Sequence, residues 1–173
     1  MSFTIKRATT DNIEELIKWR TEAIENTYVG EMSIAEREIL KYETKKYYER
    51  ELPSEGHIAC IVYIGIEKEP VGCGGMTLYY ELPSAENPTG KCACLTNIYI
   101  REEHRKKGLA TAVVTWLVFL AQERGIKKIY LNANDQSKKL FESLGFKERG
   151  DCMQLENPDA IFGCKCHSNT TEK

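Results

Sequence analysis

The first fifty positions carry one strand pattern and two helical patterns. Apolar and polar side chains alternate over residues 3–8, which predicts a short strand. Residues 9–11, Thr-Thr-Asp, are good helix N-caps, and the apolar positions of residues 13–24 then recur at helical spacing. Ser33 and Glu36 have the spacing of a capping box, and so predict the start of a second helix.

The middle of the chain reads as β-structure interrupted by turn residues. Its apolar runs are rich in Ile, Val and Tyr, and Pro and Gly separate them, as expected for strands in hairpins. Gly72, Gly74 and Gly75 mark a bulge or a close approach by another backbone or a ligand. We expect strands over 57–66, 71–80 and 91–100, a turn over 67–70 and a polar loop over 81–90.

The last third alternates helical and strand patterns. A broadly apolar helix over 111–124 is followed by Gly125 as a stop signal, and Gly145 ends a second, shorter helix. This alternation implies a crossover and a partly parallel sheet. We expect helices over 111–124 and 136–144, strands over 128–133 and near 152–155, and a flexible tail over 167–173.

Length, charge and cysteine content restrict the class of protein. A chain of 173 residues fits one domain, and 24 basic against 26 acidic residues give a net charge of −2, so nucleic acid and anionic membranes are not expected partners. The sequence shows no apolar run long enough for a secretion signal or membrane span. Seven cysteines, an odd number, suggest reduced thiols, and we expect a soluble cytoplasmic protein.

The basic run Arg105-Lys-Lys-Gly-Leu-Ala110 lies between a predicted strand and a predicted helix start. A helix N-terminus offers unpaired N–H groups and the positive end of the helix dipole, and Gly108 allows close backbone approach. These are the parts of a phosphate-binding loop. Neither the nucleotide-hydrolase spacing nor the dinucleotide spacing of glycines occurs here. A solvated basic turn is the alternative interpretation.

Two motifs resemble the GNAT superfamily of N-acetyltransferases. Arg105, Gly108 and Ala110 fill the fixed positions of its R/Q-x-x-G-x-G/A loop, and residues 134–146, NDQSKKLFESLGF, fill every fixed position of its N-x-x-[AS]-x-x-[LI]-[YF]-x-x-x-G-F pattern. The resemblance covers about residues 3–155. It implies a mixed, mostly antiparallel α/β sheet with a parallel crossover, in the order β-α-α-β-β-β-α-β-α-β, and a single domain over 1–173.

The resemblance also implies acetyl-CoA as acetyl donor and no further cofactor. The backbone of Ile98 and Ile100 would pair with the pantetheine arm, and the loop amides would hold the pyrophosphate. Asn134 and Ser137 would contact the cofactor from the other side, unless Asn134 is only a helix cap. The expected cofactor-binding residues are Ile98, Tyr99, Ile100, Arg105, Lys106, Lys107, Gly108, Leu109, Ala110, Asn134, Ser137 and Phe141.

Acetyl transfer to an amine requires a proton acceptor, because an alkylammonium has a pKa near 10 and cannot attack a thioester. The departing thiolate can take a proton from an acid. In the family this acid is commonly a Tyr at the position of Phe141, which has no proton to give. We name Tyr99 as candidate acid and Glu81 as candidate base. The other candidates are Tyr28, Tyr79 and Tyr80 for the acid, and Glu86, His57 and His104 for the base.

The acceptor is expected to be a primary amine of a small molecule. A closed pocket lined by Trp19, Arg20 and Tyr28 would favour this, whereas an open groove beside the loop over 81–90 would favour a protein N-terminus or lysine. We place that loop beside the acceptor site. A non-catalytic acyl-CoA-binding regulatory module is the other alternative. A homodimer would be unsurprising, and nothing in the sequence requires one.

Two cysteine features have alternative interpretations. Cys73 and Cys94 could act as nucleophiles, but direct transfer without an acyl-enzyme is the family norm. Cys164, Cys166 and His167 lack the two separated pairs of a structural zinc site, so we expect no metal.

Overall fold

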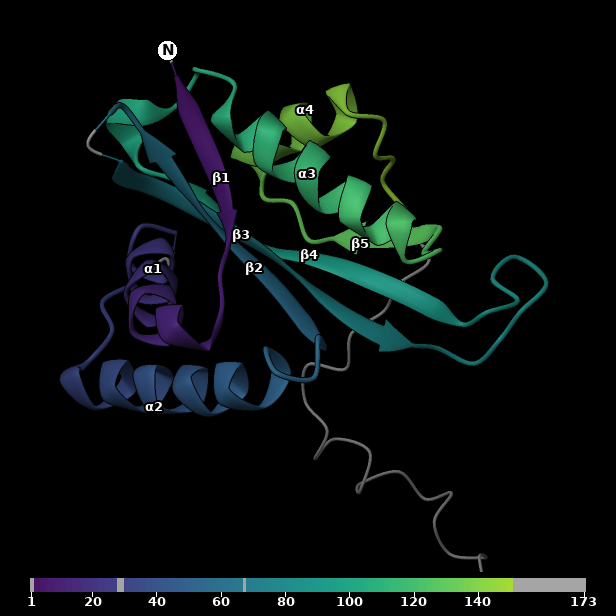
Figure 1. The fold of residues 1–173 in the computed structure, drawn as a ribbon, viewed down its shortest axis with the longest axis horizontal. Coiled ribbons are helices and arrows are strands. Elements are labelled where there is room, and N and C mark those ends of the chain that lie inside the picture. Colours follow the sequence, from purple (N-terminus) through teal and green to yellow (C-terminus); the bar gives the residue numbers. More distant parts are fainter. Residues whose placement is uncertain (1, 28–29, 67, 151–173) are drawn as a thin grey trace, which may run out of the picture.

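The computed structural model describes residues 2–27, 30–66 and 68–150. In this part of the chain five strands form one sheet in the order β1-β2-β3-β4-β5 (Figure 1). The strands are β1 (Phe3–Arg7), β2 (His57–Ile64), β3 (Glu69–Tyr80), β4 (Lys91–Ile100) and β5 (Lys128–Leu131). The helices are α1 (Ile13–Glu25), α2 (Ile34–Glu51), α3 (Leu109–Glu123) and α4 (Asp135–Ser143), with 3-10 turns η1 (Thr10–Asn12) and η2 (Glu102–His104).

The first four strands are antiparallel to their neighbours, and β4 and β5 are parallel. The chain passes between these two strands through α3, as expected for a crossover connection. The prediction of a mostly antiparallel α/β sheet with one parallel crossover is therefore confirmed. The strand predicted near 152–155 and the tail over 167–173 lie outside the described residues.

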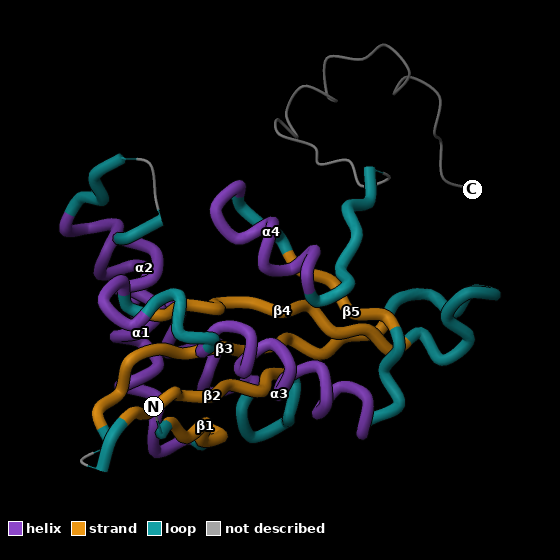
Figure 2. The backbone as a smooth tube through the Cα atoms, turned by 90° about the horizontal axis from the view of Figure 1, so that it is seen from above, coloured by secondary structure: helices purple, strands orange, loops and turns teal. Residues whose placement is uncertain are grey.

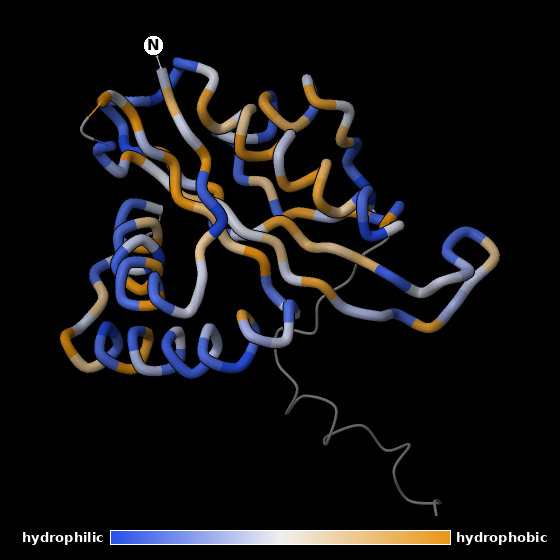
Figure 3. The backbone as a smooth tube through the Cα atoms, viewed as in Figure 1, coloured by the Kyte–Doolittle hydropathy of each residue, from blue (hydrophilic) through white to orange (hydrophobic). Residues whose placement is uncertain are grey.

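Helices cover both faces of the sheet. The pair α1 and α2 packs on one face, and α3 and α4 pack on the other (Figure 1). Seen from above, α3 lies across the central strands (Figure 2), where Val113 and Leu117 are fully buried. Hydrophobic colouring follows the inner strands and α3, whereas α2 is largely hydrophilic (Figure 3). Two separate cores therefore hold the helices to the sheet.

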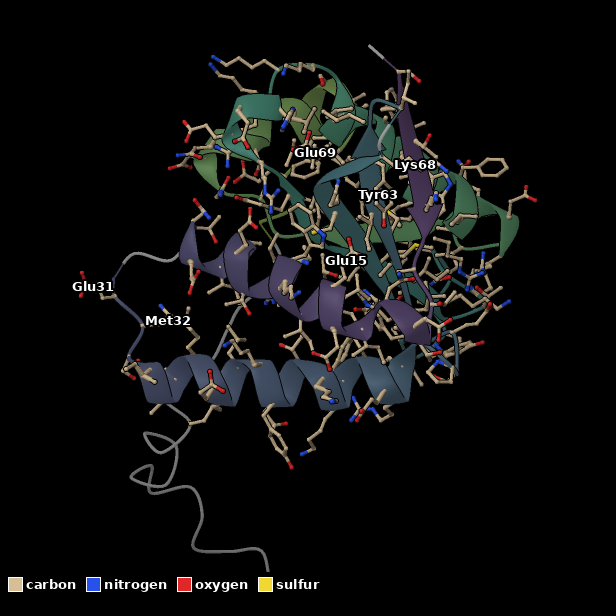
Figure 4. All side chains as sticks on the ribbon, turned by 60° about the vertical axis from the view of Figure 1, so that its left-hand side comes forward. Glu15, Glu31, Met32, Tyr63, Lys68 and Glu69 are labelled. Carbon is tan, nitrogen blue, oxygen red and sulfur yellow. The ribbon has the colours of Figure 1, made fainter. Side chains whose placement is uncertain are left out.

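The helix α1 packs directly on the sheet, and α2 packs on α1 and reaches the sheet through Tyr47 and Tyr48. Leu16 and Trp19 are buried against β2 and β4, and the hydroxyl of Tyr63 on β2 donates to a carboxylate oxygen of Glu15 at 3.5 Å (Figure 4). Glu31 and Met32 lie in the segment that leads to α2 (Figure 4). The capping box predicted at Ser33 is present, with the Glu36 amide donating to the Ser33 hydroxyl.

The predicted strand over 57–66 is wrong at its end. The strand β2 stops at Ile64, because Gly65 and Lys68 take positive φ angles in the turn, and Ile66 is 99% exposed there. Residues 69 and 70, predicted to belong to the turn, already lie in β3. Figure 4 shows Lys68 and Glu69 at this end of the hairpin. The strand was predicted to continue to residue 66 because Ile66 is apolar.

The glycines of β3 confirm the expected bulge and close approach. The β3–β4 register shifts between Cys73 and Gly75. A side chain at Gly74 would collide with Val113 on α3 and with Ile98 on β4. Glycine therefore allows α3 to pack directly onto the strand. Among the described residues, none of the helices is both long enough and apolar enough to span a membrane.

Candidate active site

The strand β4 is paired on both sides only over its first part. The parallel register with β5 runs from Cys92 to Leu95, whereas β4 continues to Ile100 and stays paired with β3. Asn97 has a φ of 54° and lies where the register between β3 and β4 is irregular. Residues 96–100 therefore have an edge that no strand of the described chain covers, which we call the unpaired edge of β4.

The backbone groups of Ile98 and Ile100 face this unpaired edge. The amide of Arg101 donates to the carbonyl of Val71 on β3. The N–H and C=O groups of successive residues in a strand point to opposite sides, so those of Ile100 and Ile98 point away from β3. The carbonyl of Ile100 accepts instead from Nε of Arg105 at 2.9 Å. An extended chain with amide groups could add to such an edge like another strand.

The basic loop ends next to the unpaired edge. Gly108 has a φ of 79° and is the N-cap residue of α3, and the first bond within the helix runs from the amide of Ala112 to its carbonyl. The amides at the start of α3 therefore have no helical acceptor. Lys106 also has a positive φ. This arrangement presents free N–H groups and positive charge in one place, as an anionic phosphate requires.

The side chain of Arg105 has no carboxylate partner in the part of the chain that the structure describes. Its guanidinium carbon lies 5.9 Å from the ring centroid of Tyr99. The ammonium of Lys107 donates to the carbonyl of Glu103. Apart from the bond from Nε to Ile100, the guanidinium of Arg105 could therefore bind an anion such as a phosphate.

Asn134, Ser137 and Phe141 lie on or beside α4. The side-chain oxygen of Asn134 accepts from the amide of Ser137 at 2.9 Å, and the hydroxyl of Ser137 accepts from the amide of Asn134. Asn134 is therefore a helix cap, although this bond leaves its NH₂ group available. Phe141 is buried and packs edge-on against Phe146 at 5.8 Å. Its ring completes the core under α3.

A pocket of about 340 Å³ opens on the other face of the sheet, between α1, α2 and the strands. We call it the α1–α2 pocket. Its strand side reaches Thr96 and Asn97, at the point where β4 leaves β5. The lining residues are Arg20, Leu40, Glu43, Thr44, Tyr47, Tyr48, His57, Thr77, Thr96 and Asn97.

Three polar side chains meet in this pocket. The Tyr47 hydroxyl lies 2.8 Å from Oγ1 of Thr77 and 3.1 Å from Nδ1 of His57, and Nδ1 lies 3.2 Å from the Thr77 hydroxyl. Burial lowers the pKa of His57 to about 4 and raises the pKa of Tyr47. At neutral pH the imidazole is uncharged and the phenol is protonated, so the group can orient and relay hydrogen bonds without carrying charge.

The other ring nitrogen of His57 faces Gly75. Nε2 has no hydrogen-bond partner in the described residues, and a side chain at Gly75 would come within 2.5 Å of it. Glycine at this position therefore makes room for the buried ring.

The residues predicted to bind the acceptor lie in different places. Arg20 lines the pocket, and its Nη1 donates to the side-chain oxygen of Asn97 at 3.4 Å. Trp19 is buried and packs against Tyr99 and under the guanidinium of Arg101, outside the pocket lining. Tyr28 lies outside the described residues.

The two candidate catalytic residues lie apart from the pocket lining. The Tyr99 hydroxyl donates to Glu22 at 3.3 Å, and Glu22 also pairs with Arg101. Burial raises the pKa of Tyr99. Glu81 forms an ion pair with Lys128 at 2.7 Å, and this bond lowers the pKa of its carboxyl group. An ion-paired carboxylate is a weaker proton acceptor than a free one.

The loop over 81–90 projects from the end of the sheet opposite α1 and α2 (Figure 1). Glu86 lies in this loop, and Tyr80, just before it, is 75% exposed. Tyr79 is partly exposed, and burial raises its pKa to about 12. His104 lies in η2, beside the basic loop. The structure does not bring this loop to the α1–α2 pocket.

Sequence reasoning missed Tyr47 and Thr77 and gave little weight to His57. Their positions in a helix and two neighbouring strands carry no local motif. The available signal was polarity: His57 and Thr77 interrupt strands that are otherwise apolar on their buried faces.

The cysteines offer no metal site in the described part of the chain, where no cluster of three candidate ligands occurs. Burial raises the pKa of Cys73 and of Cys94. Both are therefore thiols at neutral pH, which makes them poor nucleophiles. Cys164, Cys166 and His167 lie outside the described residues.

Comparison with known proteins identifies relatives of this architecture. A model of the acetyltransferase (GNAT) family matches residues 14–146. A predicted acetyltransferase with acetyl-CoA from Clostridium acetobutylicum is 21% identical, with a TM-score of 0.80 over 89% of this chain and 96% of that one. A GCN5-related N-acetyltransferase from Ralstonia eutropha JMP134 is 15% identical, with a TM-score of 0.77 over 89% and 98%.

A third similar structure is glucosamine-6-phosphate N-acetyltransferase from Arabidopsis thaliana. It is 17% identical, with a TM-score of 0.61 over 90% of this chain and 98% of that one. No curated protein matches the chain. The structural similarities establish the fold, and the family match covers the strands and helices that build both the unpaired edge and the pocket.

Proposed function

The chain belongs to the acetyltransferase (GNAT) family, whose members use acetyl-CoA as acetyl donor, and we propose that it acetylates the primary amine of a small molecule held in the α1–α2 pocket. The observation that carries this proposal is the position of the pocket. It ends at Thr96 and Asn97, directly beyond Leu95, where β4 separates from β5. A donor on the unpaired edge and an acceptor in the pocket would therefore meet at the same two residues.

The donor side of the proposal uses backbone groups and the basic loop. Ile98 and Ile100 would bind the amides of the pantetheine arm, and the amides of residues 105–110 would hold the pyrophosphate with Arg105. The free NH₂ group of Asn134 supports its assignment to the cofactor in addition to its role as a cap. Acetyl-CoA supplies the acetyl group as a thioester.

The acceptor side must bring a neutral amine to the thioester. The amine nitrogen forms the new C–N bond, and the C–S bond of the thioester breaks. The nitrogen loses a proton, and the departing thiolate gains one to become the thiol of coenzyme A. We assign Tyr47, Thr77 and His57 to positioning the amine and accepting its hydrogen bond, because they are the linked polar groups of the pocket. The Glu81 ion pair with Lys128 argues against Glu81 as the base.

Transfer is proposed to be direct. An acyl-enzyme would require a thiolate, and burial of Cys73 and Cys94 opposes thiolate formation. The proton donor for the departing thiolate is either Tyr99 or water. The hydroxyl proton of Tyr99 is hydrogen-bonded to Glu22. The thiolate can also leave unassisted, since a thiol has a pKa of about 8.5.

A small acceptor is favoured over a protein by the shape of the site. The pocket is bounded by two helices and the sheet, and the exposed loop over 81–90 lies away from it. One structurally similar protein is a glucosamine-6-phosphate N-acetyltransferase, which also acts on a small molecule. We propose that the whole chain forms one catalytic domain, since strands from both halves share a single sheet.

The test is thiol release from acetyl-CoA across amines, amino acids, polyamines, aminoglycosides and short peptides. Two glycines give matched variants, because Gly108 and Gly65 both have positive φ and open space around them. Each change to Ala carries a similar backbone strain. We expect Gly108→Ala to weaken acetyl-CoA binding and thiol release, and Gly65→Ala to leave both unchanged. Acetyl-CoA binding without release by any amine would contradict the enzymatic proposal.

A further inference from the structure

Seven arginines that lie in residues 2–124 of the described chain fall into two groups by their partners. Five of them form ion pairs with carboxylates at 3.3 Å or less, namely Arg7, Arg37, Arg50, Arg101 and Arg124. Arg20 and Arg105 have no carboxylate within ion-pair distance in the part of the chain that the structure describes. Arg105 lies in the loop assigned to an anionic pyrophosphate. Arg20 could therefore also bind an anionic group of a ligand.

Arg20 is half-buried at the pocket end of β4. Its one hydrogen bond among the described residues is the 3.4 Å contact from Nη1 to the Asn97 side chain, a neutral acceptor at long range. The next acid along α1, Glu22, is already bound to Arg101. Partial burial of a guanidinium without a counter-charge is unfavourable, because desolvation is not repaid by an ion pair. An incoming anion would remove this cost.

The other lining residues do not supply that anion. The side chain of Glu43, the carboxylate among them, is 59% exposed and lies 3.4 Å from the ammonium of Lys46. His57 is neutral, and the remaining side chains are uncharged. Arg20 is thus the one positive charge among the described lining residues, and its contact with Asn97 places it next to the proposed position of the acceptor amine.

We propose that the acceptor carries a carboxylate close to its amine, as in an α-amino acid, and that Arg20 binds this carboxylate. The inference rests on the proposed function of the α1–α2 pocket. Arg20 contacts Asn97, and the amine must reach Thr96 and Asn97 to meet the donor, so the anion and the amine are separated by only a few bonds. The planar guanidinium matches the two oxygens of a carboxylate.

Arg20 is therefore a specificity-determining residue. It selects amines with an adjacent carboxylate and turns their amine toward β4, while the acceptor side chain lies among Leu40, Thr44 and Tyr47. An amine without the carboxylate would leave Arg20 uncompensated and bind weakly. Removal of the guanidinium should abolish this preference without disturbing the donor site.

The experiment compares acceptors that differ only in the carboxylate: tyrosine with tyramine, lysine with cadaverine, and leucine with 3-methylbutylamine. Acetyl-CoA thiol release gives kcat/KM, and calorimetry with coenzyme A present gives acceptor affinity without turnover. We expect at least one amino acid to be preferred over its partner by about 10- to 100-fold, the range for a hydrogen-bonded charge pair. Arg20→Gln should remove that preference, and Arg20→Lys should restore part of it.

Lys18→Gln is the matched control, since Lys18 is an exposed cation on the same helix. It should leave the preference intact. The inference is overturned if no amino acid binds or reacts better than its partner, or if Arg20→Gln weakens both members of a pair equally. Acetyl-CoA binding that no amine converts to thiol release would instead overturn the proposed function, and the affinities of the pairs would still decide the role of Arg20.

Discussion

Burial keeps His57, which lines the pocket, uncharged at neutral pH. The residue is 3% exposed, and burial lowers its pKa to about 4 from an ordinary value near 6.5. A neutral Nδ1 in contact with two hydroxyls keeps Tyr47 and Thr77 in place. Protonation would add a buried charge between α2 and the sheet, which the surrounding apolar residues cannot solvate.

This gives a prediction for stability against pH. Between pH 6.5 and pH 4 the unfolded chain binds a proton at His57 that the folded chain does not, so the free energy of unfolding falls as the pH is lowered through this range. The loss from this residue between pH 7 and pH 5 is about 2 kcal/mol. Urea unfolding of wild type and His57→Gln at both pH values measures it. We expect a smaller loss in the variant, and an equal loss would contradict a neutral buried His57.

Single residues also mark the limit of prediction from sequence. Arg105, Gly108 and Asn134 could be proposed as cofactor-binding residues because their motifs are contiguous. Tyr47, His57 and Thr77 come from α2, β2 and β3 and meet only after folding. Arg20 was proposed at the pocket and lies there, whereas Trp19, its neighbour, turns into the core, because adjacent helix positions face different directions.

At the level of elements, the contact between α3 and β3 holds the basic loop in position. Val113 lies directly over Gly74, and Leu117 lies nearby. The helix start, with its free amides, is therefore fixed relative to β4 by a contact that admits no side chain. Loss of this contact should move the loop away from the unpaired edge.

We predict that Gly74→Ala destabilises the protein by about 1–3 kcal/mol, the usual range for overpacking a core. The double variant Gly74→Ala with Val113→Ala should lose less stability than the sum of the two single losses, because the smaller helix residue makes room for the new methyl group. Urea unfolding of both single variants and the double variant measures the coupling. Strictly additive losses would show that the two side chains do not meet.

Element boundaries were predictable where a local signal is strong. The capping box at Ser33 begins α2 as predicted, and alternation placed the first strand. The end of β2 was misplaced, because Ile66 is apolar but belongs to a turn whose shape is set by Gly65 and Lys68. Local hydrophobicity cannot report a positive φ at a lysine.

For the whole molecule, the separation of β4 from β5 is the feature that joins both halves of the site. The parallel crossover followed from the sequence, since helices and strands alternate in the last third, and the order of elements followed from the family resemblance. The point at which pairing stops, beyond Leu95, and the pocket beside it did not follow. The pocket depends on the packing of α1 and α2 against the sheet, over distances that a local pattern does not encode.

The most direct test of this account fills the pocket and measures both substrates. Thr44 lines the α1–α2 pocket, whereas Ile39 on the same helix is 63% exposed and does not line it. We expect Thr44→Trp to reduce amine-dependent thiol release to the rate without an acceptor, while acetyl-CoA binding stays unchanged. Ile39→Trp should keep both. Undiminished amine-dependent release by a folded Thr44→Trp variant would contradict the assignment of this pocket to the acceptor.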